Sequence, residues 1–352
     1  MKQEPKRHHY IPQFILRNFQ DENSQVSYWD IEKGKLEKRN TKRIFMNMHM
    51  YRDEINHQDD PTSIESTLAV FEQEIAELIK EKFLTSNEIV ITREELEKLR
   101  IFLSLLSFRS NSRMEQYRNN KFNESTRKIL EEYSPEGFED LWKREVEELA
   151  KCRSYADVKS NEVVDPIIKT DFFNDLKGMY MTLVDARGGE FLLTDIYPTL
   201  EIFPVQPGIT LHMHCFYPLS PTRMLILNHI MFKDEVDSPL FETIKSFSKI
   251  SVDMIIPPKS KHAMAMAFFP SDTYTYRVRK IYQDDVEYIN ALFLNEARVG
   301  VMFRDEERIA DSIYAFNRHG DIKKNMTLLK TNCLKRCLNK VKTTDPSVVF
   351  AL

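Results

Sequence analysis

The sequence predicts an α+β fold, with a helical bundle in the N-terminal half, a small, mostly antiparallel sheet from the C-terminal half and a short N-terminal hairpin. Apolar residues recur at helical spacing through much of the first half of the chain. After about residue 188 the pattern changes to short aromatic or β-branched runs bounded by Pro and Gly. The 352 residues are 42% apolar, which is enough for a substantial core.

The first predicted elements surround the segment "HHYIPQFILRNF", residues 8–19. Pro12 suits the first turn of a helix, so Ile11, Phe14, Ile15 and Phe19 are expected to pack inward, with Gln13 and Arg17 on the other face. A hairpin follows at 26–39, where "VSYWDIEKGKLEKRN" alternates apolar and polar residues around a Gly.

Helices are predicted for most of residues 59–185. The segment 59–84 carries an apolar stripe at helical spacing, and the segment 92–113 begins with Thr92 and Glu95 in capping-box spacing. Two further helices are predicted at about 138–152 and 165–185.

Strands are predicted at "EFLLTD", "LEIFPV", "LHMHCFYPLS" and "TRMLILN", between residues 190 and 228. A helix at 284–297 and a strand at 298–303 follow. We therefore expect one α+β domain over 1–320, with a helical part at about 60–187 and a sheet-containing part at about 188–305. The basic, amphipathic residues 321–352 are expected to form a terminal helix or tail.

Composition excludes several classes of protein. With 54 acidic and 50 basic residues the formal charge is −4, so the chain is not a wholly basic nucleic-acid binder. Only eight glycines occur, and neither GxGxxG nor GxxxxGK[ST] is present, so dinucleotide-binding and P-loop folds are not supported. No apolar run is long enough to span a bilayer, which predicts a cytoplasmic protein without a membrane partner. Four scattered cysteines predict free thiols without a disulfide partner.

Several pairs of residues have spacings that suit a site, and each has a structural alternative. His212 and His214 could share one face of a strand as metal ligands or as a cross-strand pair. Arg109 and Arg113 could form an anion clamp or stabilise a helix C-terminus. Glu65 and Glu72 could face one cleft, although a solvated pair is expected. Cys333 and Cys337 lie four residues apart without a nearby partner pair for a metal.

The opening segment resembles the N-terminal signature of a bacterial family, domain of unknown function 4238, which begins H-x-Y-x-P-x-x-x-L-x-x-F. Further segments resemble that family in order: "FRSNSR" with its Arg-rich turn, "LLTDIYP" with Thr194, Asp195 and Pro198, "FYPLSPTRMLIL", and "YINALFLNEARVGVMF". The similarity spans roughly residues 6–305. It implies a set of polar positions to consider together, namely His9, Tyr10, Gln13, Arg17, Asp195 and Asn290.

Two functions are compatible with these residues. The first is a hydrolase acting on a phosphate-bearing substrate, such as a nuclease or nucleotide hydrolase in a defence or toxin setting. It would use His9, Asp195 and Arg17 as catalytic groups, Tyr10, Gln13, Arg109 and Asn290 to bind substrate, and His8, His9 and Asp195 to hold a divalent metal. Its expected partners are nucleic acid or a nucleotide, with a homo-oligomer as a further option. The second is a non-catalytic ligand-binding or interaction module, in which the same residues form a structural hydrogen-bond network.

Overall fold

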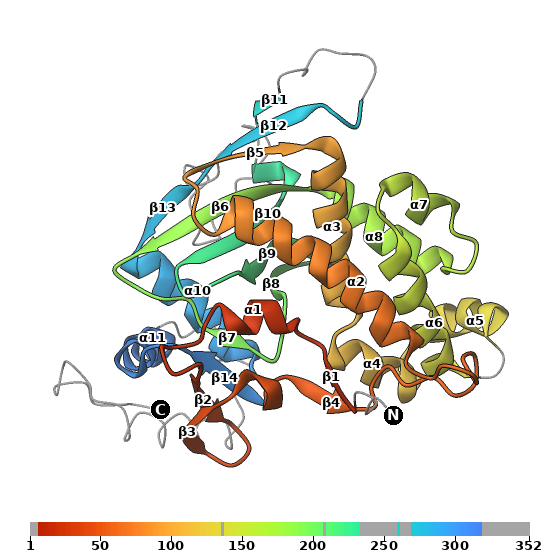
Figure 1. The fold of residues 1–352 in the computed structure, drawn as a ribbon, viewed down its shortest axis with the longest axis horizontal. Helices are drawn as coiled ribbons and strands as arrows, with labels where there is room; N and C mark the ends of the chain where they lie inside the picture. The colour runs from red at the N-terminus through yellow and green to blue at the C-terminus, as the bar shows by residue number, and fades with distance from the viewer. Residues whose placement is uncertain (1–5, 135–136, 207–208, 233–258, 261–268, 319–352) are drawn as a thin grey trace.

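The fold is α+β, as predicted, and the computed structural model describes residues 6–134, 137–206, 209–232, 259–260 and 269–318 (Figure 1). The predicted terminal helix or tail at 321–352, with Cys333 and Cys337, lies outside the described residues.

The opening segment forms a short strand and a short helix. Strand β1 (Arg7–His9) pairs antiparallel with β4 (Met46–Met48), and α1 (Gln13–Arg17) starts directly after Pro12. The 3-10 turn η1 (Thr41–Arg43) packs beside α1. Ile11, Ile15 and Phe19 are buried as expected, because they anchor this helix on the helical layer.

The predicted hairpin is confirmed as β2 (Val26–Asp30) and β3 (Lys35–Arg39). It belongs to a four-stranded sheet in the order β3-β2-β14-β7, with β14 (Gly300–Phe303) and β7 (Leu193–Thr194). The predicted strand at 190–195 is therefore shorter than expected. It joins the N-terminal hairpin through β14 instead of the main C-terminal sheet.

Long helices form one layer of the molecule (Figure 1). They are α2 (Ser63–Leu78, continued by the π-helical turn Ile79–Phe83), α3 (Arg93–Phe108), α6 (Phe138–Lys151) and α8 (Pro166–Gly178). The capping box predicted for α3 is present, since Thr92 Oγ1 accepts from the Glu95 N–H at 3.2 Å and a Glu95 carboxylate oxygen accepts from the Thr92 N–H at 2.8 Å. The layer also contains α4 (Asn111–Arg118), α5 (Glu124–Tyr133) and α7 (Tyr155–Ser160).

The main sheet has five strands in the order β13-β6-β10-β9-β8. They are β13 (Arg279–Tyr282), β6 (Met179–Arg187), β10 (Arg223–His229), β9 (Ile209–Pro218) and β8 (Thr199–Gln206). All pairs are antiparallel except β13 with β6, which agrees with the mostly antiparallel prediction. A three-stranded sheet adds β11 (Lys259–Ser260), β12 (Thr273–Arg277) and β5 (Glu88–Thr92).

The helix predicted at 165–185 is wrong beyond residue 178, because 179–187 form the central strand β6. Helices cover both faces of this sheet, so every residue of β6 except the last is buried. Leu183 packs in the core under the helical layer, and Val184 packs in a second core against α10 (Gln283–Glu296) and α11 (Glu306–Arg318). A strand buried on both faces lacks polar alternation, and periodicity cannot distinguish it from a helix.

The boundary expected near residue 187 between helical and sheet-containing parts is also wrong in detail. Strands β5 and β6 lie before it, and α10 and α11 lie after it. The single-domain assignment stays a prediction. None of the described helices is long and apolar enough to cross a membrane. The side chains of Cys152 and Cys215 are both buried.

Candidate functional site

The two adjacent histidines of the opening segment have different environments. His8 is fully buried and stacks on Tyr51, and its Nδ1 accepts the Tyr51 backbone N–H at 2.8 Å. Burial, with the nearby charges of Arg109, His8 and Arg17, lowers the pKa of His9 to about 4, against a raising hydrogen bond with the Thr41 backbone. A ring with this pKa is neutral at pH 7, and the main cause is desolvation by burial.

Arg109 connects the opening segment to the helical layer. This residue caps the C-terminus of α3 and is only 1% exposed. Its Nη2 donates to the His9 carbonyl at 2.7 Å, and its Nη1 lies 2.6 Å from Glu72 Oε1 in an ion pair. The guanidinium also lies over the Tyr51 ring. Arg109 therefore acts as a buried structural cation between α2, α3 and β1.

Glu65 and Glu72 both face this cation, so the expectation of a solvated pair is wrong. Burial raises the pKa of Glu65 to about 7, Arg109 lowers it and Glu72 raises it. The cluster therefore holds one arginine and two carboxylates. With a pKa of about 7, the Glu65 carboxyl group is partly protonated at neutral pH.

We expect Glu65 to make the wild-type protein less stable as the pH rises from about 4.5 to about 7, because the folded state binds its proton more tightly than the unfolded chain. Glu65→Gln mimics the protonated form. Its free energy of unfolding, relative to wild type, should increase by about 1–3 kcal/mol between pH 5 and pH 8. Urea unfolding at both pH values measures this difference. A constant difference would show that Glu65 titrates normally.

Gln13, Tyr10 and Arg17 surround the same region. Gln13 Nε2 donates to the Thr41 carbonyl at 3.0 Å, which links α1 to η1. Tyr10 is buried against Phe45, and burial followed by the charge of Asp195 raises the pKa of its hydroxyl. Arg17 is exposed on α1. The structure thus brings His8, His9, Gln13 and Arg109 together around backbone groups.

Asp195 is the first residue of the loop that joins β7 to β8. Its Oδ1 accepts three backbone N–H groups, from Arg298 at 2.9 Å, Val299 at 2.9 Å and Gly300 at 3.2 Å. Burial raises its pKa, while these hydrogen bonds lower it. The carboxylate therefore organises the chain that enters β14.

Asn290 has a comparable structural position. Its Oδ1 accepts the Leu192 N–H at 3.0 Å, and its Nδ2 donates to the Glu190 carbonyl at 2.7 Å and to Ser312 Oγ at 2.9 Å. Asn290 joins α10 to α11 and to the segment before β7, away from the contacts of His9.

The structure does not bring the three predicted metal ligands together. His8 Nδ1 already accepts a backbone N–H, and Asp195 Oδ1 is shared by three. Within the described ranges, no group of three or more His, Cys, Asp or Glu side chains is arranged to hold a metal ion.

His212 and His214 have different surroundings, although both lie near His229, whose pKa is lowered by burial and by these two neighbours. His214 is fully buried, and its Nδ1 lies 2.8 Å from Glu201, which in turn accepts the Tyr288 hydroxyl at 3.2 Å. His212 pairs with Ile202 across an irregularity in the β8–β9 register and lines a pocket. The cross-strand alternative fits this arrangement.

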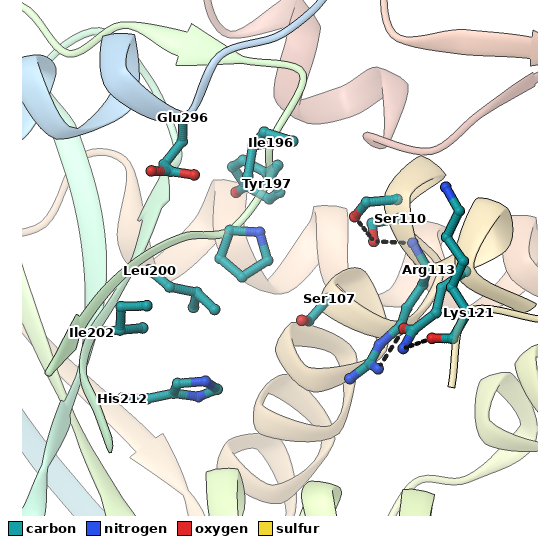
Figure 2. A pocket seen from close by; sticks show the side chains of 13 residues that line it. Ser107, Ser110, Arg113, Lys121, Ile196, Tyr197, Leu200, Ile202, His212 and Glu296 are labelled. Carbon is teal, nitrogen blue, oxygen red and sulfur yellow. Dashed lines mark hydrogen bonds between the residues drawn. The ribbon is translucent and has the colours of Figure 1, made fainter. Parts of the chain in front are cut away.

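That pocket has a volume of about 650 Å³ and lies between the helical layer and the main sheet; we call it the interlayer pocket (Figure 2). Its helical wall consists of Ser107, Ser110, Ser112, Arg113, Gln116 and Lys121. Its sheet wall consists of Ile196, Tyr197, Pro198, Leu200, Ile202 and His212, and Glu296 lies beside them. The size is within the range of small-molecule sites.

Local structure sets the helical wall. Ser110 is the N-cap of α4 and accepts the Arg113 N–H at 3.3 Å, so the chain turns sharply after α3. Arg113 donates to the Gln116 side chain at 2.9 Å, and Gln116 donates to the Lys121 carbonyl at 3.2 Å. These contacts hold the Arg113 side chain and the Lys121 backbone on the side of the pocket across from His212, and the Arg113 and Lys121 side chains point toward different ends of that side (Figure 2).

Three segments identified in the sequence therefore meet at this pocket. "FRSNSR" supplies Ser110 and Arg113, "LLTDIYP" supplies Ile196 to Pro198, and "YINALFLNEARVGVMF" supplies Glu296. Sequence reasoning missed Gln116, Lys121 and Glu296. They lie in polar helical or loop segments where such residues are usually solvated, so only their position in the fold identifies them.

A family model described as a protein of unknown function, DUF4238, matches residues 7–307. No curated protein and no solved structure matches the chain. The match covers most of the chain and includes the opening histidines, the interlayer pocket and β14. The chain belongs to the DUF4238 family.

Proposed function

We propose that this protein is a binding module for a phosphate-bearing small molecule or nucleotide, held in the interlayer pocket. The observation that carries the proposal is that Arg113 and Lys121 both line a pocket large enough for such a ligand. A guanidinium and an ammonium are each able to bind a phosphate group. The hydroxyls of Ser110 and Ser112 line the same wall and could donate further hydrogen bonds.

The opening segment supports a binding module over a catalyst centred on His9. His8, His9 and Arg109 are engaged with backbone groups, α2 and aromatic rings, as a structural network requires. None of these three residues lines the interlayer pocket. Their expected role is to place α3 and α4, and hence Arg113, relative to the N-terminal segment.

Hydrolysis of a bound phosphate ester is a second candidate. His212 and Glu296 provide an imidazole and a carboxylate in the same pocket as Arg113 and Lys121. Either group can exchange a proton with a reacting group. In this candidate, His212→Gln should abolish release of phosphate from a nucleotide and change AMP affinity by less than about threefold. If wild type releases no phosphate from any nucleotide tested, only the binding function is retained.

We expect Arg113→Gln to weaken binding of AMP about 10–100-fold, as for a lost hydrogen bond between charged groups. Isothermal titration calorimetry with the full chain measures it. Arg118→Gln is the matched control, because Arg118 belongs to the same helix, pairs with Glu139 and does not line the pocket. Equal AMP affinity of the Arg113→Gln variant and wild type would contradict the proposal.

A further inference from the structure

Two buried carboxyl groups join α6 to the start of α8. Glu145 lies in α6, Asp165 is the N-cap of α8, and both residues are 0% exposed. Asp165 Oδ1 accepts the backbone N–H groups of Ile167 at 2.7 Å and of Ile168 at 3.0 Å. The Asp165 backbone N–H in turn donates to Glu145 Oε1 at 2.9 Å. The first turn of α8 is therefore fastened to α6 through these two side chains.

The second oxygen of each carboxyl group lacks a donor. Glu145 Oε2 and Asp165 Oδ2 are both buried, and no group of the described residues donates a hydrogen bond to either of them. The two carboxyl groups are nevertheless within hydrogen-bonding reach of each other. Two ionised carboxylates in such a contact repel each other after losing their hydration. A proton on one carboxyl group removes the repulsion and supplies the missing donor to the other.

The surrounding charges favour the protonated form of Glu145. Burial, followed by the Asp165 carboxyl group, raises the pKa of Glu145 well above its ordinary value, and the charge of Arg144 lowers it less. The Arg144 guanidinium donates to the Tyr133 carbonyl on α5 at 2.8 Å. Other charged side chains of α6 and of the helices packed around it have partners of their own: Glu147 with His57, Glu148 with Lys151, Glu74 with Arg153, Arg109 with Glu72, Arg118 with Glu139, and Arg100 with the Met179 carbonyl.

We infer that Glu145 and Asp165 hold a single proton between them and form a pH-dependent contact that fastens the first turn of α8 to α6. Opening of this contact exposes the Glu145 carboxyl group to water, where it releases the proton. The open form is therefore favoured as the pH rises, by up to about tenfold for each pH unit between the ordinary pKa of Glu and the higher pKa of the closed form. Ile167, in the same turn, lines a pocket of about 330 Å³ together with residues of α4 and α5, so the contact also holds one wall of that pocket.

Hydrogen exchange of the Ile167 and Ile168 amides, followed by NMR on the full chain, tests this inference after correction for the intrinsic exchange rate at each pH. In the wild type we expect the protection of these amides to fall at least about tenfold between about pH 5.5 and about pH 7.5. Glu145→Gln keeps the acceptor for the Asp165 N–H and adds a permanent donor to the Asp165 carboxylate, so its protection should change less than about twofold. Glu148→Gln, in the same helix but with a partly exposed side chain, is the matched control and should retain the wild-type pH dependence.

A second variant separates the contact from other titrating groups. Asp165→Asn keeps the capping oxygen of α8 and gives Glu145 a neutral donor, so it should remove the pH dependence as Glu145→Gln does. Constant protection in the wild type would overturn the inference, because both carboxylates would then be ionised, as with a water molecule between them. The same pH dependence in the wild type and in both variants would also overturn it, since another group such as Glu65 would then be the cause. None of these outcomes bears on the proposed function.

Discussion

Replacing Arg109 by methionine is expected to lower the free energy of unfolding by about 3–5 kcal/mol, the usual cost of removing one partner of a buried ion pair. The substitution leaves Glu72 and Glu65 facing each other without their cation, and it removes the donor to the His9 carbonyl. Urea unfolding monitored by circular dichroism at pH 7 measures the loss.

Two companion variants make the Arg109 result specific. Arg118→Met removes a partly exposed arginine from an ion pair and should cost less than about 1 kcal/mol. Adding Glu72→Gln to Arg109→Met removes one uncompensated charge and should recover part of the lost stability. A loss below about 1 kcal/mol for Arg109→Met would contradict a structural role for this residue.

Asp195→Ala is expected to lower the free energy of unfolding by about 2–4 kcal/mol, since three backbone N–H groups lose a charged acceptor. Asp195→Asn keeps an acceptor oxygen in the same place and should cost less than about 1.5 kcal/mol. Below the unfolding temperature, both variants should bind AMP with wild-type affinity, because Asp195 does not line the interlayer pocket.

A loss of activity without a loss of stability would instead indicate a catalytic role for Asp195. If Asp195→Asn retained full stability and AMP affinity but abolished an activity of the wild type, the carboxylate would act on a substrate. Thermal unfolding and calorimetry on the same preparations separate the two outcomes.

Much of the secondary structure could be predicted because its signals are local. The α2 stripe, with Ile64, Leu68, Phe71, Ile75 and Leu78, is buried as its spacing predicts. The Thr92 capping box depends on residues three apart, and the β2–β3 hairpin turns at Gly34 with a positive φ. The boundaries of α6 and α10 agree closely with the predicted segments for the same reason.

The predicted site residues are partly grouped, and their roles depend on long-range contacts. Proximity in sequence does bring His8, His9 and Gln13 into one region. Asp195, however, finds its hydrogen-bond donors more than 100 residues later in the chain, at 298–300. Spacing within a motif does not reveal such partners.

The sequence by itself determined the α+β class, the helices with clear stripes and caps, the hairpin and the family signature, because each depends on neighbouring residues. Only the tertiary structure decided that 179–187 is a central strand, that Glu65 and Glu72 surround Arg109, and that Arg113 and Lys121 face a pocket with His212. The physical reason is that burial on both faces removes the periodic signal, and the environment of a charged side chain is set by segments that meet only when the helical layer packs on the sheet.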